Sequence, residues 1–497
     1  MDFLQKLRHF VYFSGVSALL SGCMLGPDFH APAAPITKRY TETPLPPKTV
    51  SVTGAGSAGK SQQFVTNKRI PADWWYLFHS REITRLVEAG LANSPNLAAA
   101  KASLRQSEES YHAQVGNLMY PAFGAVGLGQ RQRFAGNSIG DLASSSIFNL
   151  FNATVNVSYT LDFFGGNRRQ LESLKAQVDY AAFQLMAAHL TLTANIVTSA
   201  ISVASLEEQI RITQKLIHGQ ETQLNIIQQQ YQLGAVSKVN VLSQQTLLEQ
   251  TRATLPLLQN SLSQALHTLS TLVGDYPSQS LPKIYLEKLR LPDKIPVSMP
   301  SNLVKQRPDI GAAQALLHAA SAEIGVATAN LFPKFNLTAN EGWSASTPGS
   351  LFQGNNKVWS WGGEIIQPIF QGGSLRATRR AAIAAFDQAM AAYRQSVLQA
   401  FQNVADSLRA IETDARNFKA NKLSERSAYQ NFVLTKAQYR LGGVDYLNLL
   451  TAEIQYQQTS LARIQAQAAR YADTAALFQA LGGGWWNQTH QKDKEKT

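Results

Sequence analysis

The sequence predicts an α+β membrane protein that is built from two copies of one unit. Two similar segments lie 208 residues apart, and four stretches alternate between polar and apolar residues. Two helical stretches continue for roughly 64 residues each. The composition agrees with a folded and largely helical chain, because 44% of its 497 residues are hydrophobic and only 16% are charged.

The N-terminus has the features of a signal peptide over residues 1–22. Lys6 and Arg8 precede an apolar stretch at residues 10–20, which is far shorter than the ~20 apolar residues that span a bilayer. The stretch leads into Cys23, which is the only cysteine of the chain, so no internal disulfide can form.

The residues that end in Cys23, Leu20-Ser-Gly-Cys23, resemble the lipobox of bacterial lipoproteins. The resemblance implies cleavage before Cys23 and covalent lipid on that residue, with no other cofactor. Several acyl chains anchor a protein more firmly than one. Met24 stands in place of the aspartate that retains such lipoproteins in the inner membrane, which favours the outer membrane. The alternative is an ordinary signal peptide in which Cys23 is a chance small residue.

The internal repeat gives the domain organisation. Gln230–Leu242 aligns without gaps on Gln438–Leu450, with seven of thirteen positions identical. The expected segments are a lipidated extended linker at 23–72, a first repeat at 73–274, an inter-repeat segment at 275–306, a second repeat at 307–482 and a C-terminal tail at 483–497. The linker is rich in proline, so we expect it to wrap a surface without packing inside.

Each copy is expected to contain a helix, two strands, a very long helix, a turn and a further helix. In the first copy these are 94–118, 121–132, 151–163, 167–231 and 237–273. In the second they are 307–331, 334–345, 357–369, 374–439 and 445–481. A helix of about 64 residues extends ~96 Å, so the long helices must pack side by side.

The strands carry the membrane signal. Residues 154–163 alternate without a break, so Val155, Val157 and Tyr159 share one apolar face. Trp359 and Trp361 lie two apart in the last strand, as in an aromatic girdle. An antiparallel sheet over a water-soluble core gives the same alternation. Four strands cannot close a barrel, so a barrel must be shared between copies, and the pattern leaves their number open.

Other classes of function lack support. The net charge of +12 comes from scattered Lys and Arg residues without interleaved aromatics, so nucleic-acid binding is not expected. Motifs of metalloproteases, P-loop enzymes and serine hydrolases are missing, so we expect no enzyme. Four histidines fall in predicted helices without metal-ligand spacing and are expected on the surface: His112, His189, His218 and His267.

Beyond these patterns, the chain resembles the outer-membrane factors of tripartite efflux systems, the TolC/OprM-like lipoprotein family, in its NodT-like branch. The resemblance extends over nearly the whole chain after Cys23. The residues that carry it are Gly22-Cys-Met-Leu-Gly-Pro-Asp28, Asp73-Trp-Trp75, Phe78, Leu86-Val87, Tyr159-Thr-Leu-Asp-Phe-Phe-Gly165, Arg307-Pro-Asp-Ile310, Phe370-Gln-Gly-Gly373, Tyr439, Gly442 and Leu481-Gly-Gly-Gly-Trp485.

The resemblance implies a homotrimer with a 12-stranded outer-membrane β-barrel, four strands per chain, continued by a 12-helix periplasmic α-barrel. The inter-repeat segment and the tail would form a belt around this tunnel. The implied function is a passive conduit for small molecules such as drugs. Its implied partners are outer-membrane lipid, a periplasmic adaptor and an inner-membrane RND-type pump. A duct for type I-like protein secretion and a lipid-anchored coiled-coil scaffold remain as alternatives.

The resemblance also assigns sites near the two helical turns. The turns would contact the adaptor through Gly234, Val236, Gly442, Gly443 and Val444, although their glycines could be helix caps only. Leu447 would form an apolar gate that opposes ion passage by dewetting, or it could be ordinary interhelix packing. Thr451 replaces the acid that family members often have, and Asp445 is the candidate to substitute for it.

Overall fold

The computed structural model describes residues 24–37, 39–66, 68, 70–134 and 146–487. The predicted signal peptide, Cys23 and the end of the tail therefore lie outside the described residues. The chain divides into two compact units, which are treated separately below. The sheet unit consists of Met1–Pro32, Ser103–Ala181 and Ala312–Tyr393, and the hairpin unit of Ala33–Ala102, Ala182–Gly311 and Arg394–Thr497.

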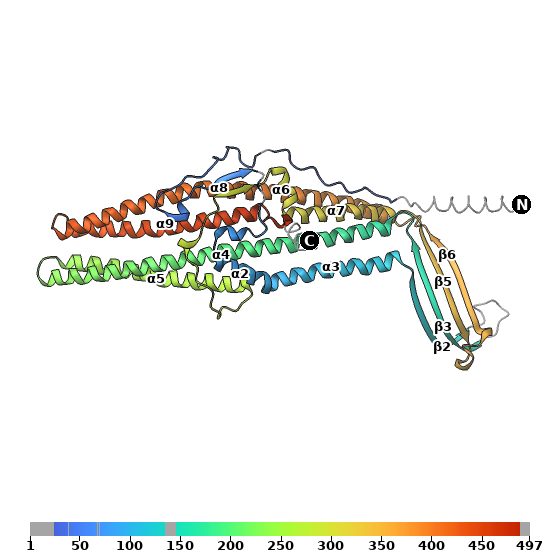
Figure 1. The fold of residues 1–497 in the computed structure, drawn as a ribbon. Helices are drawn as coiled ribbons and strands as arrows, with labels where there is room; N and C mark the ends of the chain where they lie inside the picture. Colours follow the sequence, from blue (N-terminus) through green and yellow to red (C-terminus); the bar gives the residue numbers. More distant parts are fainter. Residues whose placement is uncertain (1–23, 38, 67, 69, 135–145, 488–497) are drawn as a thin grey trace, which may run out of the picture. The chain divides into compact units, whose positions relative to one another are not determined.

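The sheet unit contains one four-stranded antiparallel sheet in the order β2-β3-β5-β6 (Figure 1). Its strands are β2 (Ala122–Phe134), β3 (Ser146–Leu161), β5 (Lys334–Ala345) and β6 (Lys357–Ile366). The first two strands come from one repeat and the last two from the other, so the central pair β3–β5 joins the repeats. The outer edges of β2 and β6 pair with no other described strand.

The strand register separates the sheet into two chemically different faces. Paired residues of antiparallel strands share a face. On one face Val157 pairs with Ala339, Tyr159 with Leu337 and Leu161 with Phe335. On the other face the polar residues of β3 meet polar residues of β5, through the pairs Asn152 with Ser344, Asn156 with Asn340, Ser158 with Thr338 and Thr160 with Asn336. The predicted alternation is therefore present, and both faces of β6 are exposed in the single chain.

The described start of the chain is held against the helices of the sheet unit, which include α7 (Pro308–Ala329) and the first part of α4. The Arg169 side chain is only 1% exposed and donates to Leu25 O at 3.1 Å. It also forms ion pairs of 2.7 Å with Asp28 and with Glu172. Gly26 has no Cβ, which lets its backbone approach α7, because a Cβ built on Gly26 would lie 2.5 Å from the Gly325 Cα.

The hairpin unit contains the greater part of the length of four long helices, two of which, α4 and α8, begin in the sheet unit. These are α4 (Gly166–Gln232), α5 (Lys238–Val273), α8 (Ser374–Arg440) and α9 (Tyr446–Ala480), while α3 (Pro95–Met119) begins in this unit. The helices α4 and α8 have 67 residues each, which corresponds to ~100 Å at 1.5 Å per residue. Each turns back tightly into its successor, α5 or α9 (Figure 1).

Smaller elements complete the hairpin unit. A two-stranded parallel sheet pairs β1 (Gln63–Thr66) with β4 (Lys294–Val297), and two short helices are α2 (Arg81–Asn93) and α6 (Pro300–Gln306). Single 3-10 turns lie at Gly56–Gly59, Trp74–Phe78, Leu286–Lys288 and Trp485–Asn487 in this unit, and at Pro348–Ser350 and Gly354–Asn356 in the sheet unit.

The expectation that residues 23–72 stay on the surface is wrong for part of this segment. Ala58, Gln62 and Ile70 are buried in the hairpin unit. The reason is Arg470 of α9, whose buried guanidinium donates hydrogen bonds to the carbonyl oxygens of Ala58 and Lys60. A buried guanidinium needs acceptors for its N–H groups, and this segment supplies three of them, with the Thr49 hydroxyl as the third.

Several predicted boundaries differ from the structure. The strand expected at 151–163 begins at Ser146, and the strand expected at 357–369 ends at Ile366, two residues before Pro368, which has no N–H to donate. The strand at 334–345 and the four long helices agree with expectation within one residue at each end.

Within the described ranges, two helices, α4 and α7, contain apolar stretches long enough to cross a membrane by length and composition alone. Core helices of water-soluble proteins contain similar stretches, so this criterion does not distinguish between the two environments.

Candidate functional site

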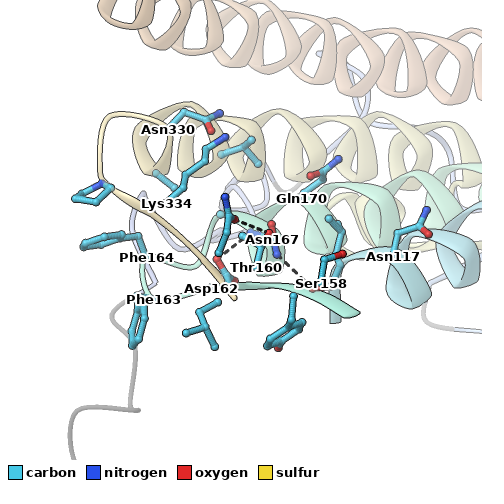
Figure 2. Close-up of a pocket in the computed structure, with 18 of the residues that line it drawn as sticks. Asn117, Ser158, Thr160, Asp162, Phe163, Phe164, Asn167, Gln170, Asn330 and Lys334 are labelled. Atoms are coloured by element: carbon cyan, nitrogen blue, oxygen red, sulfur yellow. Dashed lines mark hydrogen bonds between the residues drawn. The ribbon is translucent and has the colours of Figure 1, made fainter. Parts of the chain in front are cut away.

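A cavity of about 520 Å³ lies in the sheet unit where strands meet helices. Figure 2 shows polar side chains from several elements around this cavity. They are Asn117 of α3, Ser158 and Thr160 of β3, Asn167 and Gln170 of α4, Asn330 after α7 and Lys334 of β5. The cavity therefore continues the polar face of the sheet onto the helices.

Asp162 fixes the turn from β3 into α4 at this junction (Figure 2). Its carboxylate accepts hydrogen bonds from the backbone N–H groups of Asn167 at 3.1 Å and Arg168 at 3.0 Å. These donors belong to the first turn of α4, where N–H groups have no partner within the helix. Across the neighbouring strands, Thr160 donates to Asn336 at 2.9 Å. These hydrogen bonds hold the backbone and the strands that carry the polar side chains of the cavity.

The candidate gate lies on the first turns of α9, in the hairpin unit. Leu447 and Thr451 are four residues apart, so they lie on one side of the helix, and both are exposed. Leu447 is 65% exposed, whereas Leu449 is only 1% exposed. The Thr451 hydroxyl donates to Leu447 O at 2.8 Å, which satisfies it within the helix. The α9 helix therefore presents a Leu-Thr stripe away from its own chain.

Asp445 is the N-cap of the same helix. Its carboxylate accepts a hydrogen bond from the Asn448 backbone N–H at 3.0 Å, while the residue remains exposed. This is the standard capping role of an aspartate. The structure thus places Asp445 two residues before Leu447, where one of its carboxylate oxygens accepts a hydrogen bond from the helix backbone.

The two helical turns have the same backbone geometry. Gly234 and Gly442 have φ values of 73° and 75°, a left-handed conformation that favours glycine. In the first turn Ala235 N donates to Gln230 O at 2.8 Å, and in the second Gly443 N donates to Gln438 O at 2.9 Å. These are Schellman-type helix ends. Both turns therefore contain one left-handed glycine at the equivalent position.

The side chains at the turns divide into exposed and packed residues. Leu233 and Leu441, which are equivalent in the two repeats, are 84% and 88% exposed. Val236 instead packs against a buried cluster formed by Ile227, Val241, Tyr446 and Leu449. Gly442 and Gly443 are exposed, and Val444 is half-buried. Both copies of the repeat keep a leucine before the glycine, so the sequence marks Leu233 and Leu441 as equivalent, but only the structure shows that they are exposed.

A buried polar group lies beside this cluster and was not foreseen from the sequence. Glu453 lies seven residues, or two helical turns, after Tyr446, and both are on the buried side of α9. Burial raises the pKa of its carboxyl to about 7, while Lys436 of α8 and the Gln220 amide of α4 act in the opposite direction. The buried hydroxyl of Tyr446 donates to Gln244 of α5. Polar groups from four helices thus meet next to the candidate gate.

His189 does not lie on an open surface as expected. It lines a cavity of about 460 Å³ in the hairpin unit, together with Lys101 and the indoles of Trp74, Trp75 and Trp485. Burial lowers the pKa of its imidazole. His112, His218 and His267 are exposed. Within the described ranges, no three His, Cys, Asp or Glu side chains are arranged to hold a metal ion.

Comparison with known proteins identifies the family. The family model described as outer membrane efflux protein matches residues 86–275 and 299–483, which include both repeats. The chain is similar to the antibiotic efflux pump outer membrane protein ArpC of Pseudomonas putida, with 28% identity over 479 residues and 96% of each chain covered. It is also similar to the pyoverdine export outer membrane protein OpmQ of Pseudomonas aeruginosa, with 32% identity over 423 residues, 83% of this chain and 87% of OpmQ.

A solved structure agrees with these relatives. The outer-membrane channel OprN matches with a TM-score of 0.83 at 26% identity, covering 93% of this chain and 100% of OprN. Its fold, like this one, combines strands with long helices. The chain therefore belongs to the outer membrane efflux protein family and is an outer-membrane component of an efflux system, in a family of channel proteins rather than enzymes.

Proposed function

We propose that three copies of the chain close their sheets into one 12-stranded barrel, continued by a 12-helix periplasmic tunnel. The observation that carries this proposal is the pair of free edges on β2 and β6. Lipid cannot satisfy unpaired backbone groups, so open edges are not stable inside a bilayer. Single-chain barrels need at least about eight strands, and the described part of this chain supplies four to the sheet. The number three follows from the resemblance to the outer-membrane factors.

The two faces of the sheet support the direction of closure. The apolar face, with Tyr159, Leu337 and Trp361, would contact lipid, and the face with Asn156 and Asn340 would line water. Closure in the opposite sense would place the apolar residues in water and the asparagines in lipid. The polar cavity at the strand-helix junction would then belong to the channel wall.

The proposed gate and partner sites lie at the helical turns. Three copies of the Leu447 stripe around one axis would form an apolar constriction. The exposed leucines Leu233 and Leu441 would give the periplasmic adaptor an apolar surface. The adjacent turn residues would complete this contact site: Gly234, Val236, Gly442, Gly443 and Val444. An RND-type pump in the inner membrane would then deliver cargo, and the channel itself would remain a passive conduit.

Small organic molecules such as drugs are the proposed cargo. The names of ArpC and OpmQ associate those proteins with antibiotics and pyoverdine, which are small molecules. The polar face of the sheet has few charges, with Lys334 and Glu364 among them, which suits passage of varied solutes.

Covalent lipid on Cys23 is proposed as an additional anchor. The support lies in the residues that follow it. Leu25 N donates to Phe164 O at 3.2 Å, three residues after β3 ends at Leu161. The chain two residues after Cys23 is thus fixed at the end of the membrane sheet, where an acyl chain could reach the bilayer.

The experiment that tests the proposal combines gel mobility with conductance. Purified full-length protein is expected to run as a trimer on unheated gels, to collapse to monomers on boiling, and to give discrete conductance steps in planar bilayers. A strain lacking the protein should accumulate a fluorescent dye substrate. A monomer with no conductance, in detergents that preserve its helical content, would refute the proposal.

A further inference from the structure

The apolar face of the sheet ends in a cationic segment. Trp343 lies eight residues after Phe335 in β5, so the band between their two rows extends ~26 Å along the strand. This is comparable with the ~25 Å apolar band of outer-membrane barrels. Gly127 of β2 lies in the same row as Trp343, because both pair with Ala153 of β3.

Two arginines continue this face beyond the apolar band. Arg131 and Arg133 lie four and six residues past Gly127, ~13 and ~20 Å further along β2. They pair with Asn149 and Ile147, so they share the face of Val155 and Val157 rather than the polar face. Both side chains are exposed, and no ion pair to either is found among the described residues.

The other charges on this face are already neutralised. Lys357 lies in the Trp343 row and forms an ion pair of 2.5 Å with Glu341. Trp343, Trp359 and Trp361 surround this pair on the same face. Aromatic side chains at this level are typical of the boundary between acyl chains and headgroups. The two arginines therefore lie past this aromatic level, and among the described residues no carboxylate pairs with either of them.

We propose that Arg131 and Arg133 bind the phosphate groups of phosphorylated glycolipid in the outer leaflet. Phosphate is the anion that a membrane offers at this depth, and guanidinium groups bind it through paired N–H donors. The two arginines are ~7 Å apart along the strand, so a headgroup with two phosphates can engage both. The inference rests on the proposed closure of the barrel, because only then does this face meet lipid.

The test uses the full-length trimer in nanodiscs of phosphatidylcholine with added lipid A, a glycolipid with two phosphates. Native mass spectrometry counts the lipid A molecules that remain bound per trimer. We expect the variant Arg131→Gln/Arg133→Gln to bind lipid A about tenfold or more weakly, because both positions lose their charged hydrogen bonds to phosphate. Arg131→Lys/Arg133→Lys should give an intermediate value, since lysine keeps the charge without the paired donors.

Controls separate the sources of phosphate and the effect of charge alone. Lys334→Gln removes a positive charge from the polar face of the same sheet and should bind lipid A as the wild type does. Dephosphorylated lipid A should bind weakly to every variant, and excess inorganic phosphate should not displace lipid A. If the double variant retains lipid A like the wild type, or if inorganic phosphate binds equally well, the inference is wrong.

The outcomes also distinguish this inference from the proposed function. A protein that forms no trimer and no channel contradicts the proposed function. A conducting trimer whose lipid A binding does not depend on the arginines contradicts only the lipid site. If the double variant does not assemble, the single changes Arg131→Gln and Arg133→Gln are used, and each should weaken binding by a smaller factor.

Discussion

Leu447 and its repeat counterpart Val239 have nearly the same exposure, 65% and 68%, in the first turns of equivalent helices. The exposure of one residue therefore does not explain a gate. What distinguishes Leu447 is its place beside Thr451 and the capping Asp445 at the start of α9. A constriction arises only if three copies bring this particular stripe to one axis.

The change Leu447→Ser tests this assignment. A hydroxyl wets an apolar ring, so conductance through the otherwise closed channel should rise, by about tenfold if the dewetting barrier falls by ~1.4 kcal/mol. Single-channel recording in planar bilayers measures the change. The matched variant Val239→Ser removes a similarly exposed apolar side chain and should conduct like the wild type. Equal effects of both changes would assign Leu447 to ordinary surface packing.

At the scale of elements, the turns between helices depend on single glycines. Gly442 has φ 75° and open space around its missing Cβ, so a substitution there changes backbone energy without a clash. Gly443 follows directly but is not left-handed, and its Cβ would meet nothing closer than Gln438 O at 3.5 Å. The pair is therefore a control for backbone conformation alone.

We expect Gly442→Ala to destabilise the α8–α9 hairpin by about 1 kcal/mol or more, because alanine rarely adopts a left-handed conformation. Hydrogen exchange of the amides in this turn and the Tm of the trimer measure the effect. Gly443→Ala should leave both near the wild-type values. If the two variants behave alike, the left-handed conformation is not what holds the turn.

Glu453 makes the stability of the region where α4, α5, α8 and α9 meet depend on pH. Its pKa is raised by burial from 4.5 to about 7 in the folded state, with Lys436, Gln220 and Tyr446 as its polar neighbours. At low pH both the folded and the unfolded state carry the proton, and burial costs little. As the pH rises from 4.5 to about 7, the unfolded state ionises first, so stability falls and then levels off above that range.

The change Glu453→Gln should remove this dependence. Each pKa unit corresponds to ~1.4 kcal/mol, so the variant should gain on the order of 3 kcal/mol per chain at neutral pH. Tm values recorded between about pH 5 and pH 8 give the measurement. The exposed Glu109→Gln change should leave the pH profile as it is, and an unchanged profile in Glu453→Gln would contradict the account.

At the scale of the whole molecule, the repeat and the periodicities account for much of the fold. The strand at 334–345 and the four long helices could be predicted because their patterns are uninterrupted. The start of β3 could not be predicted, because the adjacent apolar residues Ile147 and Phe148 break the alternation. Both nevertheless pair with β2. The β1–β4 sheet depends on pairing between residues more than 200 apart and on Pro296 inside a short strand, which no local pattern indicates.

The site was predictable to a lesser degree. The two turns could be located because they recur in the repeat, whereas Leu447 was singled out only by the resemblance to the outer-membrane factors. Glu453 could not be recognised as buried, since its burial depends on how four helices pack. The arginines of β2 became informative only once the strand register assigned them to the apolar face.

The orientation of the sheet in a closed barrel is the central claim, and accessibility to a water-soluble maleimide tests it most directly. Single cysteines are placed on the polar face, as Asn156→Cys or Asn340→Cys, and on the apolar face, as Val157→Cys or Ala339→Cys. Asn156 pairs with Asn340 across the two strands, and the neighbouring Val157 pairs with Ala339. In trimers reconstituted in bilayers, the account predicts rapid labelling and reduced conductance for the polar-face cysteines, with no labelling of the apolar-face cysteines. Equal labelling of both faces, or labelling of the apolar face alone, would contradict it.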